Sequence, residues 1–210
     1  MKARSWVHSQ YEARVRPALV AAVDGYSWAE EHAFVREWFT PVDGPLLDLA
    51  CGGGDHTRLL VQAFGAQRVV AADLDPNALL RARDALTRTP GARHDDTMSR
   101  CAVPLIRCDA ASLPVASAAL GGVICFGGLA LFARPAAVFA ELQRCMKPGA
   151  PLVGVCPARP RSHLGRAAVG AMGHRTWQVE PLTKQLAAGG LQRLKIVRRG
   201  WTILFAARKS

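Results

Sequence analysis

The sequence predicts an α/β fold: a seven-stranded, mostly parallel sheet with helices on both faces and a C-terminal antiparallel hairpin. Short apolar runs alternate with helical patterns along most of the chain, which is typical of βαβ units around a parallel sheet. Most of these runs lack polar alternation, as expected for strands that are covered on both faces. The chain has 210 residues, half of them hydrophobic, which suffices for one domain with a full core and is short for two.

Seven candidate strands are bounded by turn residues and are too short to be helices. They cover residues 46–50, 68–72, 103–107, 121–126, 152–156, 191–197 and 201–207. The last two flank Arg198-Arg199-Gly200, a short link that predicts a closing hairpin.

Helical patterns fill the segments between the strands. Those over 76–87 and 135–146 begin with a proline, which suits the first turn of a helix. The second of them ends at Lys147-Pro148-Gly149, where a cation, a proline and a glycine stop a helix. Two more helices are predicted over 55–64 and 180–188.

The chain therefore divides into three parts of one predicted domain. Residues 1–44 form an N-terminal helical cap, because residues 5–39 combine helical spacing with several aromatic side chains. Residues 45–156 form the core, in which the polar segment 89–100 is an exposed loop. Residues 157–210 form a short cap, a helix and the closing hairpin.

The positive charge is concentrated near the C-terminus. The net charge is +11, and residues 157–210 alone hold 11 Lys and Arg against one acid, Glu180. Such a region can meet nucleic acid, an anionic membrane surface or an acidic substrate, or it can be a solvated face that keeps the protein in solution.

Cysteine spacing and hydropathy exclude other classes of protein. The six cysteines lie among apolar residues without the spacing of a zinc site or a disulfide framework, so we expect small buried side chains and no metal site. No run approaches the roughly 18 to 20 apolar residues of a membrane-spanning helix, so no span is expected. The first eight residues are basic but have no apolar run behind them, which favours the cytoplasm.

The clearest functional signal is a glycine loop at the end of the first strand. An apolar strand runs directly into Gly52-Gly53-Gly54 and then into a helix, and glycine lets a ligand lie against the backbone. Asp73 follows Gly54 by 19 residues and ends the second strand, where a carboxylate can accept both hydroxyls of a ribose. The same pattern also serves nicotinamide and flavin dinucleotides.

Two residues favour S-adenosylmethionine over a dinucleotide. Thr57 stands where the dinucleotide fingerprint has its third glycine, which opens the helix N-terminus to a pyrophosphate. Asp48, beside the loop, would repel a phosphate but suits a cationic ammonium or sulfonium.

Four segments in order resemble the class I S-adenosylmethionine-dependent methyltransferases, particularly the small methyltransferase-domain group related to ubiquinone and menaquinone methylases. The segments are 47–54, 70–76, 108–114 and 141–149, and the resemblance extends over about residues 46–155. It implies a Rossmann-like fold, methyl transfer, S-adenosylmethionine as the cofactor and S-adenosylhomocysteine as the product.

The resemblance also implies where the cofactor lies. In it, Asp73 takes the ribose, Asp109 accepts from the adenine amino group, and Phe126 and Gly127 face the transferring methyl. Tyr11 closes over the cofactor. The full set of implied cofactor-binding residues is Tyr11, Asp48, Ala50, Cys51, Gly52, Gly54, Asp73, Leu74, Asp109, Ala110, Phe126 and Gly127.

Three features depart from the family pattern. Gly121-Gly122 stand where many relatives have an acidic residue. Residues 127–131 are glycine or apolar, whereas relatives often carry polar side chains there that touch the substrate. The connection 157–179 is short, so the site is either open or covered by a second copy or another partner. We expect a monomer or a homodimer.

Few indispensable catalytic side chains are expected. A methyl group on a sulfonium is already activated, and alignment alone can supply roughly 7 to 11 kcal/mol of the barrier. A base helps only when the nucleophile carries a proton that must leave. Tyr11, His163 and His174 are the candidate bases or orienting groups; for these histidines, as for His8 and His56, a structural or solvent-facing role is the commoner one.

The predicted function is transfer of a methyl group to an oxygen, nitrogen or carbon atom of a small molecule. One alternative is an RNA or DNA methyltransferase that uses the basic C-terminal region, although no recognised nucleic-acid module is present. The other is a protein that binds S-adenosylmethionine for a non-methylating or assembly role, because fold does not fix function.

Overall fold

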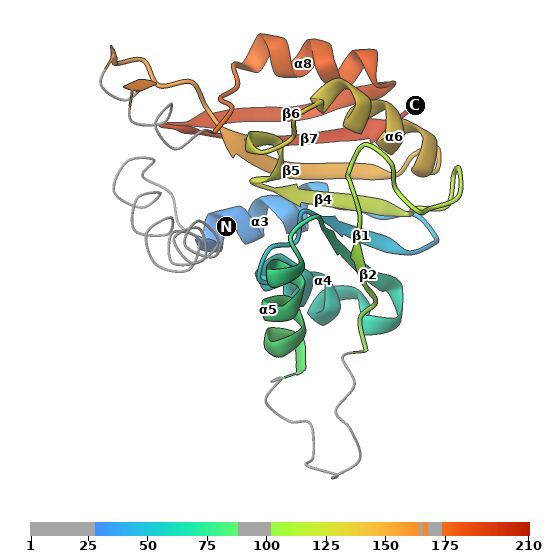
Figure 1. Ribbon diagram of the computed structural model, residues 1–210. Helices are drawn as coiled ribbons and strands as arrows, with labels where there is room; N and C mark the ends of the chain where they lie inside the picture. Colours follow the sequence, from blue (N-terminus) through green and yellow to red (C-terminus); the bar gives the residue numbers. More distant parts are fainter. Residues whose placement is uncertain (1–27, 88–101, 164–165, 168–173) are drawn as a thin grey trace.

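The computed structural model describes residues 28–87, 102–163, 166–167 and 174–210 (Figure 1). Its strands are β1 (Leu46–Leu49), β2 (Val69–Asp73), β3 (Leu105–Arg107), β4 (Gly122–Phe126), β5 (Pro151–Pro157), β6 (Leu191–Arg199) and β7 (Thr202–Lys209). Its helices are α3 (Trp28–Trp38), α4 (Asp55–Phe64), α5 (Pro76–Thr87), α6 (Pro135–Cys145) and α8 (Val179–Ala188), with 3-10 turns η3 (Ala66–Arg68) and η4 (Gly128–Ala130).

All seven strands form one sheet in the order β3-β2-β1-β4-β5-β7-β6. Strands β1 to β5 pair in parallel, whereas β7 is antiparallel to both β5 and β6. The predicted α/β fold with a mostly parallel sheet and a C-terminal antiparallel hairpin is therefore confirmed.

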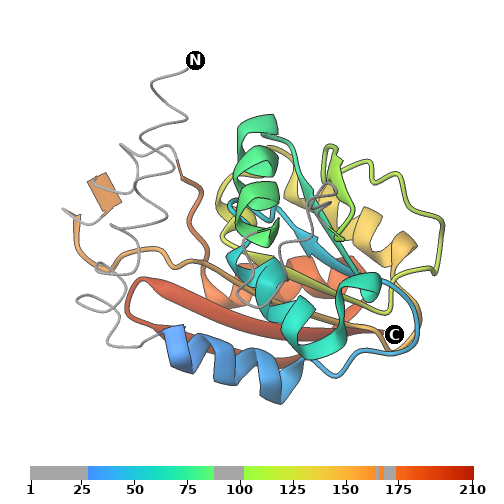
Figure 2. The same cartoon turned by 90° about the horizontal axis from the view of Figure 1, so that it is seen from below.

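Helices cover both faces of the sheet. Helices α6 and α8 pack on one face, where Phe139 and Leu182 join the larger apolar core. Helices α3, α4 and α5 pack on the other face, which Figure 2 shows from below. In β1, Leu46 belongs to the core under α3 to α5 and Leu47 to the core under α6 and α8. This burial on both faces explains why the strand reads as a continuous apolar run.

Several strand boundaries differ by one or two residues from the prediction, and two of these differences have a clear backbone reason. Strand β3 begins at Leu105 rather than at residue 103, because Pro104 has no N–H and only its carbonyl joins the sheet, accepting from the Ala71 N–H at 3.0 Å. Ala50, predicted as the last residue of the first strand, has a φ of 59° and lies in the loop that follows.

The prediction that Arg198-Arg199-Gly200 links the hairpin is wrong. Both arginines belong to β6, with Arg199 opposite Thr202, and the turn is Gly200-Trp201. Strand β6 is the exposed edge of the sheet, so its polar residues do not distinguish it from a turn in the sequence. Gly200 has a φ of 47°, which suits this tight turn.

The glycine pair at the start of β4 is explained by packing. A Cβ atom on Gly121 would collide with the carbonyl oxygen of Val42, and one on Gly122 would lie 2.7 Å from the Phe39 ring. The segment that joins α3 to β1 packs against both glycines, so no side chain fits at either position.

Other expectations concern single residue types. Cys51, Cys125, Cys145 and Cys156 are buried free thiols, as predicted for small hydrophobic residues, and Cys108 is half-buried. The described residues contain no group of His, Cys, Asp and Glu that could hold a metal ion. No helix in the described ranges has the length and hydropathy needed to cross a membrane. The predicted loop 89–100 and most of the predicted N-terminal cap lie outside the described residues.

Candidate functional site

The candidate site lies at the carboxyl ends of β1, β2 and β4. Strand β1 pairs with β2 on one side and with β4 on the other, so the chain order of the strands reverses between β1 and β4. In open parallel sheets, a crevice outside this switch point is where ligands bind. The loops at residues 50–54, 74–75 and 127–134 meet at this edge.

The glycines of the first loop serve two different purposes. Gly52 has a φ of 55°, and a Cβ atom added to Gly52 or Gly53 would meet no atom within 4 Å. These two residues therefore border open space. Gly54 has a φ of 85°, and its added Cβ atom would lie 3.2 Å from Ala82 of α5. The third glycine thus permits close packing of α4 on α5, while the first two leave room for a ligand.

Asp48 and Cys51 lie beneath this loop and are buried. The Thr57 hydroxyl donates a hydrogen bond of 2.6 Å to the Asp48 carboxylate, and the Cys51 N–H donates to the carbonyl of Ala72 at 3.0 Å. Burial raises the pKa of Asp48 to about 6, although the nearby His56 and the hydrogen bond from Thr57 both lower it. Asp48 therefore supports the loop from below, and its role toward a cationic ammonium or sulfonium of the cofactor stays a prediction.

Asp73 is fixed at the end of β2 by two backbone groups. Its Oδ2 accepts the Gly52 N–H at 2.9 Å, and its Oδ1 accepts the Asp75 N–H at 2.9 Å. Each carboxylate oxygen keeps a further lone pair, so a pair of ribose hydroxyls can still donate to it. Leu74, the next residue, has an exposed fraction of 63% and offers an apolar surface at the same edge.

Two other aspartates near the site lie at the starts of helices. The carboxylate of Asp75 accepts the Asn77 N–H at 2.9 Å and so caps α5. Asp55 is the first residue of α4, where a negative charge suits the positive end of the helix, and it pairs with Arg58 at 3.1 Å.

Asp109 lies in the loop after β3. Its Oδ1 accepts the Ala111 N–H at 2.9 Å, and its Oδ2 lies 3.4 Å from the guanidinium of Arg134 in the loop after β4. The neighbouring Ala110 is buried. Asp109 thus joins two of the loops that border the site, and its predicted bond to the adenine stays a prediction.

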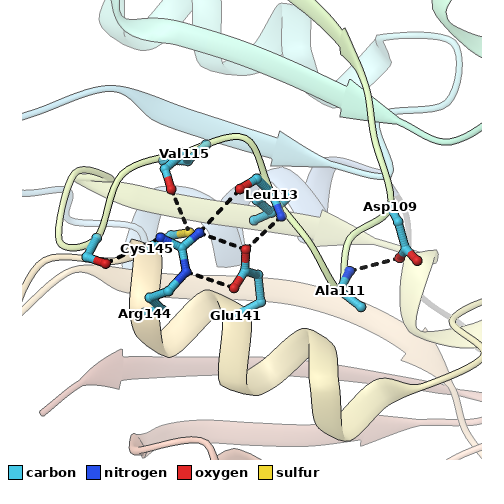
Figure 3. Close-up of polar contacts among 8 residues, drawn as sticks. Asp109, Ala111, Leu113, Val115, Glu141, Arg144 and Cys145 are labelled. Carbon is cyan, nitrogen blue, oxygen red and sulfur yellow. Dashed lines mark hydrogen bonds and ion pairs between the residues drawn. The ribbon is translucent and has the colours of Figure 1, made fainter.

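A hydrogen-bonded group on α6, which the sequence analysis did not single out, holds the loop after β3 in place (Figure 3). The Leu113 N–H donates to Glu141 at 2.7 Å, and the Arg144 guanidinium donates to both Glu141 oxygens, at 2.7 and 2.9 Å, and to the Leu113 carbonyl at 3.2 Å. The Arg144 hydrogen bonds, together with that from Leu113, lower the pKa of Glu141. The i, i+3 spacing of the two charges was the signal available in the sequence.

A stack of rings closes the site behind the glycine loop. The His56 and Phe126 rings stack with centroids 3.9 Å apart and an interplanar angle of 14°, and the His56 Nε2 lies 3.7 Å from the buried Glu31 carboxylate. His32 meets His56 edge to face. Phe126 is thus placed at the predicted methyl end of the site, whereas the role of Glu31 and His32 could not be foreseen, because α3 is distant in sequence.

Gly127 and Gly128 follow Phe126 for different reasons. Gly127 has a φ of 83°, and its added Cβ atom would meet nothing within 4 Å, so it too borders open space. An added Cβ atom on Gly128 would lie 2.7 Å from that of Ala50, so this glycine allows the β4 and β1 loops to touch.

The candidate bases fall in different places. His163 is exposed, and His174 lines a cavity of about 860 Å³ between α6, α8 and the segment after β5. Tyr11 and His8 lie outside the described residues. The described chain brings together the glycine loop, Asp73 and Phe126, while His163 and His174 belong to the segment after β5.

The strands and loops of this site belong to a segment that is similar to known proteins. Residues 46–149 match the family model described as "Methyltransferase domain", and they hold the whole of the β1 to β4 arrangement. The chain therefore carries a methyltransferase domain over residues 46–149.

Its relatives in this family are distant in sequence. An uncharacterized chloroplastic methyltransferase of Arabidopsis thaliana is 27% identical over 127 residues, which are 60% of this chain and 34% of that protein. The chain spans about a third of the length of the curated relatives it matches.

Many solved structures share the fold. The geranyl diphosphate C-methyltransferase of Streptomyces coelicolor, crystallised with Mg²⁺, geranyl diphosphate and S-adenosylhomocysteine, has a TM-score of 0.72 and 15% identity, over 87% of this chain and 81% of that one. A putative methyltransferase in complex with the Haloferax volcanii Trm112 activator has a TM-score of 0.71 and 16% identity, over 95% of this chain and 96% of that one.

Proposed function

We propose that the protein is an S-adenosylmethionine-dependent methyltransferase that acts on a small molecule. The observation that carries the proposal is the junction of β1 and β2, where the Asp73 carboxylate is held by the Gly52 N–H at 2.9 Å beside two glycines that border open space. This arrangement presents an oriented carboxylate next to bare backbone, as a ligand with a ribose requires.

The described residues fit this cofactor. Asp73 would hold the ribose, Leu74 would lie against the adenine, and Gly52, Gly53 and Gly127 leave room that any side chain would fill. When bound, S-adenosylmethionine supplies a methyl group on a positively charged sulfur. The chain's part is to hold the acceptor in line with that group, because alignment can supply roughly 7 to 11 kcal/mol of the barrier.

The residues near the methyl end support a reaction driven by alignment. Neither Phe126 nor Gly127 carries an acidic or basic side chain, and the nearby Glu31 carboxylate is buried beside His56. These two residues would help to align the acceptor without removing a proton from it. His174 is the described candidate for a base on the acceptor side, because it lines the adjoining cavity.

Two observations support a small acceptor. The cavity of about 860 Å³ lies at the same edge of the sheet, and pockets for small molecules commonly measure roughly 300 to 1,000 Å³. The similar geranyl diphosphate methyltransferase was crystallised with a small molecule. A cytoplasmic location and a monomer or homodimer stay predictions.

A nucleic-acid substrate is the second candidate, and the exposed edge strand favours it. Arg193, Lys195 and Arg199 are exposed on β6. A nucleic-acid methyltransferase would bind RNA or DNA with an affinity that falls steeply as salt is added.

Formation of S-adenosylhomocysteine tests the proposal. The protein is incubated with S-adenosylmethionine and a broad set of small acceptors, and the product is measured by mass spectrometry. We expect product with at least one acceptor and a loss of about tenfold or more in Asp73→Ala, since charged hydrogen bonds to the ribose are removed. Asp84→Ala, at an exposed position on α5, is the matched control. Binding without product across the set would favour a non-methylating role instead.

A further inference from the structure

The cavity beside the predicted methyl end is strongly cationic. Arg159, Arg166, Arg175 and Lys184 line it, and no Asp or Glu is among its described lining residues. Lys184 pairs with Glu180 at 2.7 Å on the exposed side of α8. Among the residues that the structure describes, none of the three arginines forms an ion pair with a carboxylate. The cavity therefore keeps most of its positive charge.

The walls of the cavity are fixed by hydrogen bonds. The Trp177 indole N–H donates to the carbonyl of Leu129 at 3.1 Å, and the N–H groups of Arg159 and Arg175 donate to the carbonyls of Trp177 and Ala130, both at 2.8 Å. The backbone of two of the charged residues is thus fixed, and their exposed side chains extend from it. A fixed backbone reduces the entropy that the site loses when it binds a ligand.

The same contacts join the cavity to the candidate cofactor site. Leu129 and Ala130 belong to η4, which directly follows Gly127 at the predicted methyl end. The first residues of α6 and α8, which include Pro135 and Pro181, also border the cavity. The N-terminal ends of helices carry partial positive charge, so both helices add to the potential of the arginines.

From this arrangement we infer that the cavity binds a phosphate or diphosphate group of the small molecule that accepts the methyl, an inference that rests on the proposed function. Arginine matches phosphate oxygens through two parallel N–H groups, and several cations in one cavity suit a group with more than one negative charge. A partly open cavity of about 860 Å³ has the volume of a small-molecule pocket, whereas a nucleic acid would bind along the exposed edge strand β6.

Binding of inorganic diphosphate, measured by calorimetry on the full chain, tests the inference. We expect saturable binding, with and without S-adenosylhomocysteine present, and a loss of about tenfold or more in both Arg159→Gln and Arg175→Gln, as expected when one charged hydrogen-bond donor is removed. Arg193→Gln on β6 is the matched control and should change the affinity less than about twofold. S-adenosylhomocysteine should bind all of these variants equally.

The outcomes separate this inference from the proposed function. If S-adenosylhomocysteine binds and diphosphate does not, the inference about the cavity is wrong and the proposed function stands. If a 20-nucleotide RNA binds more tightly than diphosphate and Arg193→Gln weakens it as much as the cavity variants do, the basic region serves nucleic acid and the inference is also overturned. Failure of S-adenosylhomocysteine itself to bind the folded protein would contradict the proposed function.

Discussion

Replacing Asp48 by Asn should change how the stability of the protein depends on pH. The Asp48 side chain lies buried beneath the glycine loop, and burial raises its pKa from the ordinary value of 3.8 to about 6. Between these two values the folded protein holds a proton on Asp48 that the unfolded chain has released, so the stability falls as the pH rises through this window. The difference of about two pKa units corresponds to a loss of about 3 kcal/mol in the free energy of unfolding. This loss is complete above about pH 6 and absent below pH 3.8.

Asp48→Asn removes this ionisation and keeps an oxygen that can accept the Thr57 hydroxyl. We therefore expect the variant to gain up to about 3 kcal/mol relative to the wild type between about pH 4 and pH 7. Urea unfolding of both proteins at several pH values gives the free energies. The test uses only how the difference in unfolding free energy between the two proteins changes with pH. A cost of the amide that does not depend on pH therefore has no effect on the result.

Asp55→Asn is the matched control for this experiment. Asp55 is exposed and lies just after the same loop, so this variant tests whether the change in the pH profile requires a buried carboxyl group. Parallel pH profiles for the wild type and Asp48→Asn would refute the reasoning, because they would show that the buried carboxyl titrates as it does in the unfolded chain.

Two further substitutions test the loops around the site. Gly54→Ala should lower the free energy of unfolding by about 1 to 3 kcal/mol, because φ is 85° and the new Cβ atom would press on α5 at 3.2 Å. Gly53→Ala is the control and should match the wild type in urea unfolding, because its new Cβ atom would meet nothing within 4 Å. Equal losses in the two variants would contradict this reasoning. Glu141→Gln should cost about 1 to 3 kcal/mol near pH 7, because it weakens the bonds to Arg144 and Leu113. Since these bonds lower the pKa of Glu141, the deficit should shrink as the pH falls below the ordinary value of 4.5, and a deficit independent of pH would argue against the charged pair.

The elements predicted well from the sequence are those that one local signal determines. Strands β1, β4 and β5 are buried on both faces, so their continuous apolar runs were visible. Helices α4 and α5 lie where the glycine loop and Pro76 predicted them to start. The position of Asp73 beside the loop followed from the parallel order of two neighbouring strands.

Features that depend on distant segments could not be predicted. The stack of His56 on Phe126 beside Glu31 joins three elements, and no local pattern relates them. The charge near the C-terminus was visible, but only the fold shows which cations share a cavity with α6. Arg199 lies in β6 and not in the predicted turn, because an exposed edge strand and a turn have similar composition.

Calorimetric titration of the folded protein with S-adenosylhomocysteine, in the wild type and in Asp73→Ala, tests the central claim most directly. The account predicts binding at one site per chain and an affinity about tenfold or more lower in the variant, because the carboxylate that Gly52 orients would no longer meet the ribose. Equal binding by both proteins would contradict the assignment of Asp73, and absence of heat with the folded wild type would contradict the cofactor site itself.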